Sequence, residues 1–188
     1  MKLKTQNSKL KTKNKKNIEE KAQKIKLLIL DVDGVMTDGS IILDNNGNEL
    51  KRFYVRDGHG IKMLQKAGIK VAIITGRKSD VVDRRAAELG ITDVYQKIFR
   101  KSVVYEELLN KYNLSDNNVA FMGDDIVDVE LLKRAGLTAA PADADEEAKK
   151  HADIIMRKSG GRGAVREFTD LILKSTGFWE KVSGEFLG

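Results

Sequence analysis

Three aspartates follow a short apolar run in the segment LILDVDGVMTDG of residues 28–39. They are Asp31, Asp33 and Asp38. Burying one carboxylate costs free energy, and neighbouring carboxylates repel each other. Acidic side chains directly after a buried strand therefore indicate a bound cation or acid–base chemistry. An Asp-x-Asp pair alone is a weak signal, because helix caps and surface turns also carry aspartates.

Two further polar segments stand where an apolar run ends, and a lysine stands at an expected helix start. Thr75 and Gly76 follow the run IKVAII, Lys101 opens an expected helix, and the acidic segment GDDIVD begins directly after NVAFM. In open parallel sheets, ligands bind beyond the carboxyl ends of the strands. We therefore expect Asp31, Thr75 and Asp124 to converge on one crevice.

Short apolar runs alternate with amphipathic segments along the rest of the chain. Strands are expected at 26–31, 69–75, 94–96, 118–124, 138–143 and 152–156, and helices at about 58–66, 79–89, 101–112, 127–134, 144–150 and 163–175. This alternation predicts an α/β fold, a Rossmann-like three-layer parallel sheet with helices on both faces. The segment 40–55 is expected to add a protruding β-hairpin around Asn45-Asn46-Gly47-Asn48.

The chain length of 188 residues suits one domain, expected at 25–180 and followed by a tail at 181–188. Residues 1–26 hold ten lysines and two glutamates, so the net charge of +6 leaves about −2 for the remainder. We expect residues 1–24 to be a disordered extension. A nucleic-acid or membrane tether is the alternative, but no aromatics interleave the lysines. We predict no nucleic-acid or membrane partner and, without a signal sequence, a cytoplasmic protein.

The motifs DVDGVMTDG, TGR, an isolated lysine and GDDIVD, in this order, resemble the haloacid dehalogenase superfamily of phosphotransferases. The stretch 25–180 resembles its small capless branch, on DGSIILDNNGNELKRFYVRDGHGIKML, ITGRKSDVVDRRAAELGI and GGRGAVREF. The resemblance implies hydrolysis of 3-deoxy-D-manno-octulosonate 8-phosphate for lipopolysaccharide assembly. A phosphatase for nine-carbon ketoaldonate 9-phosphates and a non-catalytic assembly domain associated with a sugar-acid cytidylyltransferase are the alternatives.

The resemblance also implies roles for individual residues. Asp31 would attack phosphorus, and Asp33 would protonate the leaving oxygen and later deprotonate water. Mg²⁺ would be held by the Asp31 carboxylate, the Asp33 backbone carbonyl and the Asp124 carboxylate. Asp125 and Asp128 would be auxiliary metal ligands or supporting residues. The phosphoryl oxygens would be bound by Thr75, the N–H of Gly76 and Lys101. A helix-end charge is the alternative for Asp128.

The loop before Lys101 departs from the branch, which usually has a glycine after Tyr-Gln where this chain has Lys97. Lys97 and Arg100 therefore compete with Lys101 for the phosphate, and we favour Lys101 because it opens the helix. Substrate binding is expected from Gly76, Arg77, Arg56, Asp57, Gly58 and Arg162. The resemblance further implies a homotetramer in which hairpins form a central barrel and a neighbouring subunit closes each active site. The alternative is a hairpin that folds back on its own domain.

Overall fold

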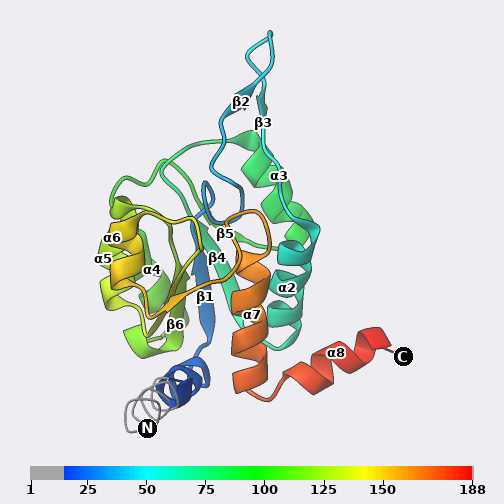
Figure 1. The fold of residues 1–188 in the computed structure, drawn as a ribbon, viewed down its shortest axis with the longest axis vertical. Coiled ribbons are helices and arrows are strands. Elements are labelled where there is room, and N and C mark those ends of the chain that lie inside the picture. Colours follow the sequence, from blue (N-terminus) through cyan, green and yellow to red (C-terminus); the bar gives the residue numbers. More distant parts are fainter. Residues whose placement is uncertain (1–14, 188) are drawn as a thin grey trace, which may run out of the picture.

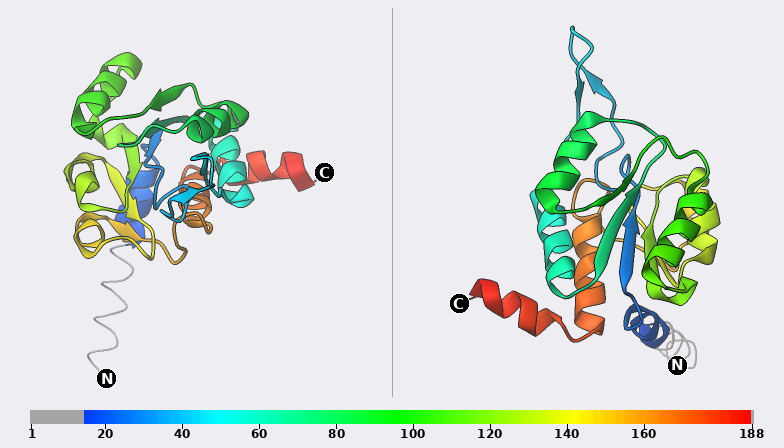
Figure 2. Two further views of the ribbon diagram at one scale, coloured as in Figure 1. Left: turned by 90° about the horizontal axis from the view of Figure 1, so that it is seen from above. Right: turned by 180° about the vertical axis from the view of Figure 1, so that it is seen from behind.

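The structure, a computed structural model, describes residues 15–187 and has a parallel six-stranded sheet at its centre. The strand order is β5-β4-β1-β6-β7-β8. The strands are β1 (Leu27–Leu30), β4 (Lys70–Ile74), β5 (Asp93–Tyr95), β6 (Val119–Met122), β7 (Leu137–Ala140) and β8 (Ile154–Ile155). Helices lie on both faces of this sheet, which confirms the predicted fold class (Figures 1 and 2).

Strand β1 divides the core, because its successive side chains point to opposite faces. Leu28 and Leu30 join the cluster that contains α2, α3 and α7, whereas Leu27 and Ile29 join the cluster that contains α4, α5 and α6. The helices are α2 (Val55–Lys66), α3 (Asp80–Leu89), α4 (Lys101–Tyr112), α5 (Val129–Arg134), α6 (Glu146–His151), α7 (Ala164–Ser175) and α8 (Trp179–Leu187), with 3-10 turns at Asp116–Asn118 and Ile126–Asp128.

The register of the central strands brings the predicted site residues to one edge. Leu30 pairs with Ile73 of β4 on one side and with Met122 of β6 on the other. The residues that follow these three positions therefore leave the sheet side by side. This is the crevice edge that the sequence predicted.

The hairpin stands away from the domain, with β2 (Ile42–Leu43) paired antiparallel to β3 (Glu49–Leu50) (Figure 1). Its strands are shorter than the segment 40–55 suggested. The Asp44 carboxylate shapes the turn by accepting hydrogen bonds from the backbone N–H groups of Asn46 and Asn48, each at 2.8 Å. Ile41 and Leu43 are each 62% exposed, so the hairpin does not fold back on its own domain.

Both termini differ from expectation. Residues 15–22 are helical, although a disordered extension was predicted over 1–24, and residues 1–14 lie outside the described part. The helix forms because Ile18 and Ala22, one turn apart, give it an apolar stripe that packs on the core. At the other end, residues 181–187 belong to helix α8 rather than to a tail, and Val182 is buried. Within residues 15–187, no helix combines the length and apolarity needed to cross a membrane.

Candidate functional site

A cavity of about 250 Å³ lies at the carboxyl ends of β1, β4 and β6. It gathers every residue predicted to act in catalysis or metal binding, together with Gly76 and Arg77. The polar lining residues are Asp31, Asp33, Thr75, Arg77, Lys101, Asp124, Asp125 and Asp128, and Ile98, Phe99 and Val127 supply an apolar side. Because all these residues follow strand ends or open helices, the sheet itself assembles the site.

Lys101 is the cation at the centre of the cavity. Its side chain is 3% exposed, and its Nζ donates hydrogen bonds of 2.6 Å to Asp31 Oδ1 and to Asp128 Oδ1. Burial lowers the pKa of Lys101, but the two carboxylates outweigh burial and raise it above the usual value. The competing residues Lys97 and Arg100 are exposed. The geometry therefore agrees with the choice of Lys101 as the cation facing the nucleophile.

Asp128 holds the backbone of the acidic loop through hydrogen bonds. Its side chain is fully buried, and its Oδ2 accepts hydrogen bonds from the backbone N–H groups of Asp124 at 3.0 Å and Asp125 at 3.4 Å. A Cβ on Gly123 would lie 2.5 Å from Asp128, so only glycine fits there. Asp125 instead points outward and caps the turn that follows, where its Oδ1 accepts from the N–H of Ile126 at 2.6 Å.

The three buried or half-buried carboxylates could hold a divalent cation. Asp31, Asp124 and Asp128 each offer an oxygen within 4.8 Å of the others. Desolvation raises the pKa of Asp31 to about 7, although Lys101 opposes the rise. Desolvation and then the charge of Asp31 raise the pKa of Asp124 to about 8. A bound cation would relieve this repulsion, and a donor set made only of oxygens fits Mg²⁺.

Asp33 has a partner that the sequence analysis missed. The ammonium group of Lys51, from the base of the hairpin, donates a hydrogen bond to Asp33 Oδ1. The same ammonium lies 3.5 Å from Glu49 Oε1, and Glu49 accepts a hydrogen bond of 2.7 Å from Arg77. Residues 49 and 51 are two apart, so they share one face of an extended strand. The alternating spacing of Glu49 and Lys51 in GNELKRF was visible in the sequence. It did not show that Lys51 pairs with Asp33, which lies 18 residues earlier in the chain.

The structure places the other expected substrate contacts outside this cavity. Arg56 and Arg162 line a separate basic cavity of about 660 Å³ with residues of α7. Asp57 is buried and caps α7, accepting from the N–H groups of Gly163 at 3.3 Å and Arg166 at 2.7 Å. Burial raises the pKa of Asp57 to about 6. Gly58 packs against Arg85, where a Cβ would lie 2.3 Å from the guanidinium.

Asp38 has a turn-forming position. Its Oδ1 accepts a hydrogen bond of 3.3 Å from the N–H of Ser40, and its other oxygen accepts one from Arg52 on the returning hairpin arm. The Arg52 hydrogen bond is the main cause of a lowered Asp38 pKa. Asp38 therefore fixes the base of the hairpin and is absent from the catalytic lining among the described residues.

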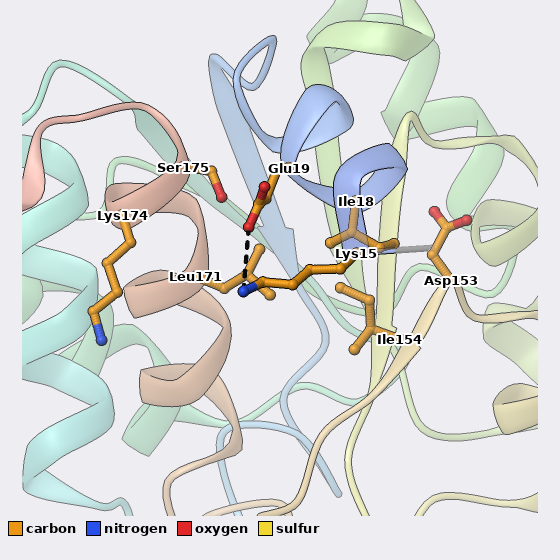
Figure 3. A pocket seen from close by; sticks show the side chains of 8 residues that line it. All are labelled: Lys15, Ile18, Glu19, Asp153, Ile154, Leu171, Lys174 and Ser175. Atoms are coloured by element: carbon orange, nitrogen blue, oxygen red, sulfur yellow. Dashed lines mark ion pairs between the residues drawn. The ribbon is translucent and has the colours of Figure 1, made fainter. Parts of the chain in front are cut away.

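A further cavity of about 570 Å³ lies between the helix of residues 15–22, β8 and α7 (Figure 3). Ile18, Ile154 and Leu171 line it. Lys15 and Glu19 also line it and form an ion pair, with 3.8 Å between Lys15 Nζ and Glu19 Oε1. Among the described residues, it shares none with the catalytic cavity. The acidic cluster of Asp31, Asp124 and Asp128 is not part of its lining.

Known proteins resemble this chain over nearly its whole length. Residues 85–168 match the pattern of haloacid dehalogenase-like hydrolases. The 3-deoxy-D-manno-octulosonate 8-phosphate phosphatase KdsC of Escherichia coli strain K12 is 48% identical over 165 residues, which are 88% of each chain. This chain belongs to the haloacid dehalogenase-like hydrolases.

Solved structures support the same relationship. The crystal structure of 3-deoxy-D-manno-octulosonate 8-phosphate phosphatase from Moraxella catarrhalis, in complex with magnesium, phosphate and KDO, has a TM-score of 0.88 to this haloacid dehalogenase-like hydrolase. It is 41% identical and covers 90% of this chain and 97% of its own. A hydrolase of the same superfamily from Legionella pneumophila has a TM-score of 0.92 and 44% identity, covering 95% and 98% of the two chains.

Proposed function

We propose that this protein is a Mg²⁺-dependent phosphatase that hydrolyses 3-deoxy-D-manno-octulosonate 8-phosphate to the free sugar acid and phosphate. The observation that carries the proposal is the Asp31–Lys101–Asp128 arrangement beside Asp124, in a cavity open to a phosphate-sized group. The phosphatases of E. coli and M. catarrhalis carry this activity in their names and match the chain at 48% and 41% identity. Release of the sugar acid would serve lipopolysaccharide assembly in the cytoplasm.

In the first half-reaction, a carboxylate oxygen of Asp31 attacks phosphorus and forms an aspartyl-phosphate. The bond between phosphorus and the sugar oxygen breaks, and Asp33 delivers a proton to that oxygen. Lys101 holds the nucleophilic carboxylate through its 2.6 Å hydrogen bond and faces the negative charge that develops on the phosphoryl oxygens.

In the second half-reaction, Asp33 accepts a proton from water as the water attacks the acyl-phosphate. Phosphate leaves, and the Asp31 carboxylate is restored. The second step depends on the same side chain as the first because Asp33 ends the first step deprotonated and ready to act as the base. Its place beside Asp31 at the mouth of the cavity allows both roles.

The metal would be held by the Asp31 and Asp124 carboxylates and the backbone carbonyl of Asp33, with Asp125 and Asp128 in supporting positions. When bound, Mg²⁺ supplies positive charge that lets a phosphate dianion approach these carboxylates. Thr75 and Gly76, which follow β4, line the same cavity as the acidic loop. We assign them to the phosphoryl oxygens, with the backbone N–H of Gly76 as a donor.

The sugar acid carries a carboxylate beside its phosphate, and Arg77 is the cation at the cavity that is suited to bind it. The apolar groups at this end of the molecule extend beyond what one subunit covers, because Phe99 is 91% exposed and Val127 is 61% exposed. Together with the exposed hairpin, they support a homotetramer in which a neighbouring subunit closes the site.

A substrate panel tests the proposal directly. Initial rates are measured on 3-deoxy-D-manno-octulosonate 8-phosphate, a nine-carbon ketoaldonate 9-phosphate and simple sugar phosphates, each with and without EDTA. We expect the highest kcat/KM on the eight-carbon substrate and loss of turnover with EDTA. Preference for the nine-carbon substrate would overturn the substrate assignment, and an absence of turnover on every compound with Mg²⁺ present would overturn the enzymatic function.

A further inference from the structure

Four side chains of alternating charge connect the hairpin base to the two loops of the catalytic cavity. The order is Asp33, Lys51, Glu49 and Arg77. Asp33 comes from the loop after β1, and Arg77 comes from the loop after β4. The two middle residues, Glu49 and Lys51, belong to the returning arm of the hairpin.

Lys51 is placed to hold Asp33 and not to hold substrate. Its side chain is only 1% exposed, whereas the Asp33 side chain is 22% exposed and reaches the cavity. Of the described residues that line the cavity, neither Lys51 nor Glu49 is one. Burying an ammonium group is costly without charged partners, and here two carboxylates offset the cost. Lys51 therefore contacts the acid–base residue without lining the cavity itself.

We propose that Lys51 is a positioning residue that fixes the Asp33 carboxylate for both proton transfers, and that Glu49 likewise fixes Arg77. The inference rests on the proposed phosphatase function and adds Lys51 and Glu49 to the residues that support it. The hydrogen bond from Lys51 limits rotation of the Asp33 carboxylate. A misplacement of about 1 Å in a catalytic group can cost on the order of 10²-fold in rate.

The returning arm of the hairpin links Asp33 to Arg77 through Lys51 and Glu49. Since Glu49 lies in β3 and Lys51 directly follows that strand, one short stretch of the returning hairpin arm sets the separation between the proton-transfer group and the substrate-binding cation. Lys51 should therefore affect the chemical steps, and Glu49 should affect substrate affinity. These separate effects can be measured on the same protein.

The test compares Lys51→Met and Lys51→Arg with a control at the same hairpin base, Arg52→Met. The methionine keeps the aliphatic packing of the lysine stem, and arginine keeps the charge. Arg52 pairs with Asp38 and is 58% exposed, so its loss loosens the hairpin without touching Asp33. Circular dichroism and thermal melting establish that each variant is folded.

For Lys51→Met we expect kcat on the sugar phosphate to fall by about 10- to 100-fold with KM changed less than about 2-fold. Lys51→Arg should recover part of kcat, and Arg52→Met should stay close to wild type. With p-nitrophenyl phosphate, whose leaving group needs no proton, Lys51→Met should show a burst of nitrophenolate. The burst would mean that Asp31 is still phosphorylated while attack by water has slowed.

Glu49→Gln should instead raise KM for the sugar-acid phosphate by several-fold and leave KM for p-nitrophenyl phosphate unchanged, because that compound has no carboxylate for Arg77. Wild-type kcat in a folded Lys51→Met variant would overturn the positioning role. Equal loss in Arg52→Met would attribute the effect to the hairpin as a whole and also overturn it. Retained turnover in Asp33→Asn would overturn the acid–base assignment in the proposed function, which separates the two failures.

Discussion

The carboxyl edge of the sheet and the protruding hairpin are opposite kinds of region. At the sheet edge, charged groups are buried: Asp31 is 6% exposed and Lys101 is 4% exposed. On the hairpin, apolar groups are exposed: Ile41 and Leu43 are each 62% exposed. Each region is unfavourable in the isolated chain, one because of desolvated charge and the other because of hydrated apolar surface. We propose that a cation completes the first region and that a neighbouring subunit completes the second.

The largest effect is expected from Asp31→Asn at the sheet edge. The amide keeps the size of the side chain and an oxygen that can accept from Lys101, but it cannot attack phosphorus. Turnover should fall by at least about 10⁴-fold, a loss comparable with removal of a nucleophile in other covalent enzymes. Steady-state rates measure the loss, and thermal melting verifies the fold. Wild-type turnover in this variant would show that Asp31 is not the nucleophile.

A smaller effect is expected at the hairpin. Leu43→Asp places a charge on the exposed apolar face and should dissociate the proposed homotetramer into folded subunits, with kcat/KM reduced about 10- to 100-fold. Asn46→Asp, at the polar turn, is the control and should change neither property. Light scattering gives the mass, and rates are taken on the same samples. Full activity in a dissociated Leu43→Asp variant would show that a neighbouring subunit is unnecessary.

The acidic cluster predicts an effect of pH on stability without metal. The pKa values of Asp31 and Asp124 lie at about 7 and 8, above the ordinary value of 3.8. Between pH 4 and 8 the folded state thus binds more protons than the unfolded state, so its stability falls as pH rises. In EDTA, the Tm should fall from pH 5 to pH 8. Saturating Mg²⁺ should raise Tm most at pH 8, because it binds the ionised carboxylates. A Mg²⁺-induced shift in Tm that is the same at pH 5 and pH 8 would contradict this account.

The smallest effect is expected at Lys97, on the loop beside the cavity. Lys97 has φ of +59°, a conformation that glycine adopts without the steric cost of a Cβ. Lys97→Gly should relieve about 1 kcal/mol of this strain, offset in part by the greater freedom of glycine in the unfolded chain. Urea unfolding should therefore show a gain of less than about 1 kcal/mol with kcat retained. A clear loss of stability would mean that the lysine side chain contributes more than its backbone costs.

Lys97 shows the limit of predicting the phosphate-binding cation from sequence motifs. The sequence alone identified a lysine where glycine is usual and left three cations in competition for the phosphate. The structure places Lys97 in the left-handed region and buries Lys101 against Asp31. The helix start at Lys101 was predictable, but which cation reaches the nucleophile depends on the path of the whole loop.

The termini show a different limit. The lysine-rich composition of residues 1–24 predicted disorder, yet residues 15–22 form a helix because Ile18 and Ala22 reach the core. Charge counts average over a segment, whereas packing depends on which few residues share a helical face. Val182 in α8 is likewise buried, although the segment 181–188 was predicted to be a tail.

The sequence by itself determined the fold class and which residues meet at the candidate site, because apolar strands end in Asp31, Thr75 and Asp124 and parallel strands align their ends. Local order along the chain is enough for that inference. Only the tertiary structure decided that Lys51 holds Asp33, and that Asp57 caps α7, 106 residues away, instead of facing the cavity. Such pairings depend on how separate loops and helices meet in space, and residue type and spacing do not specify that meeting.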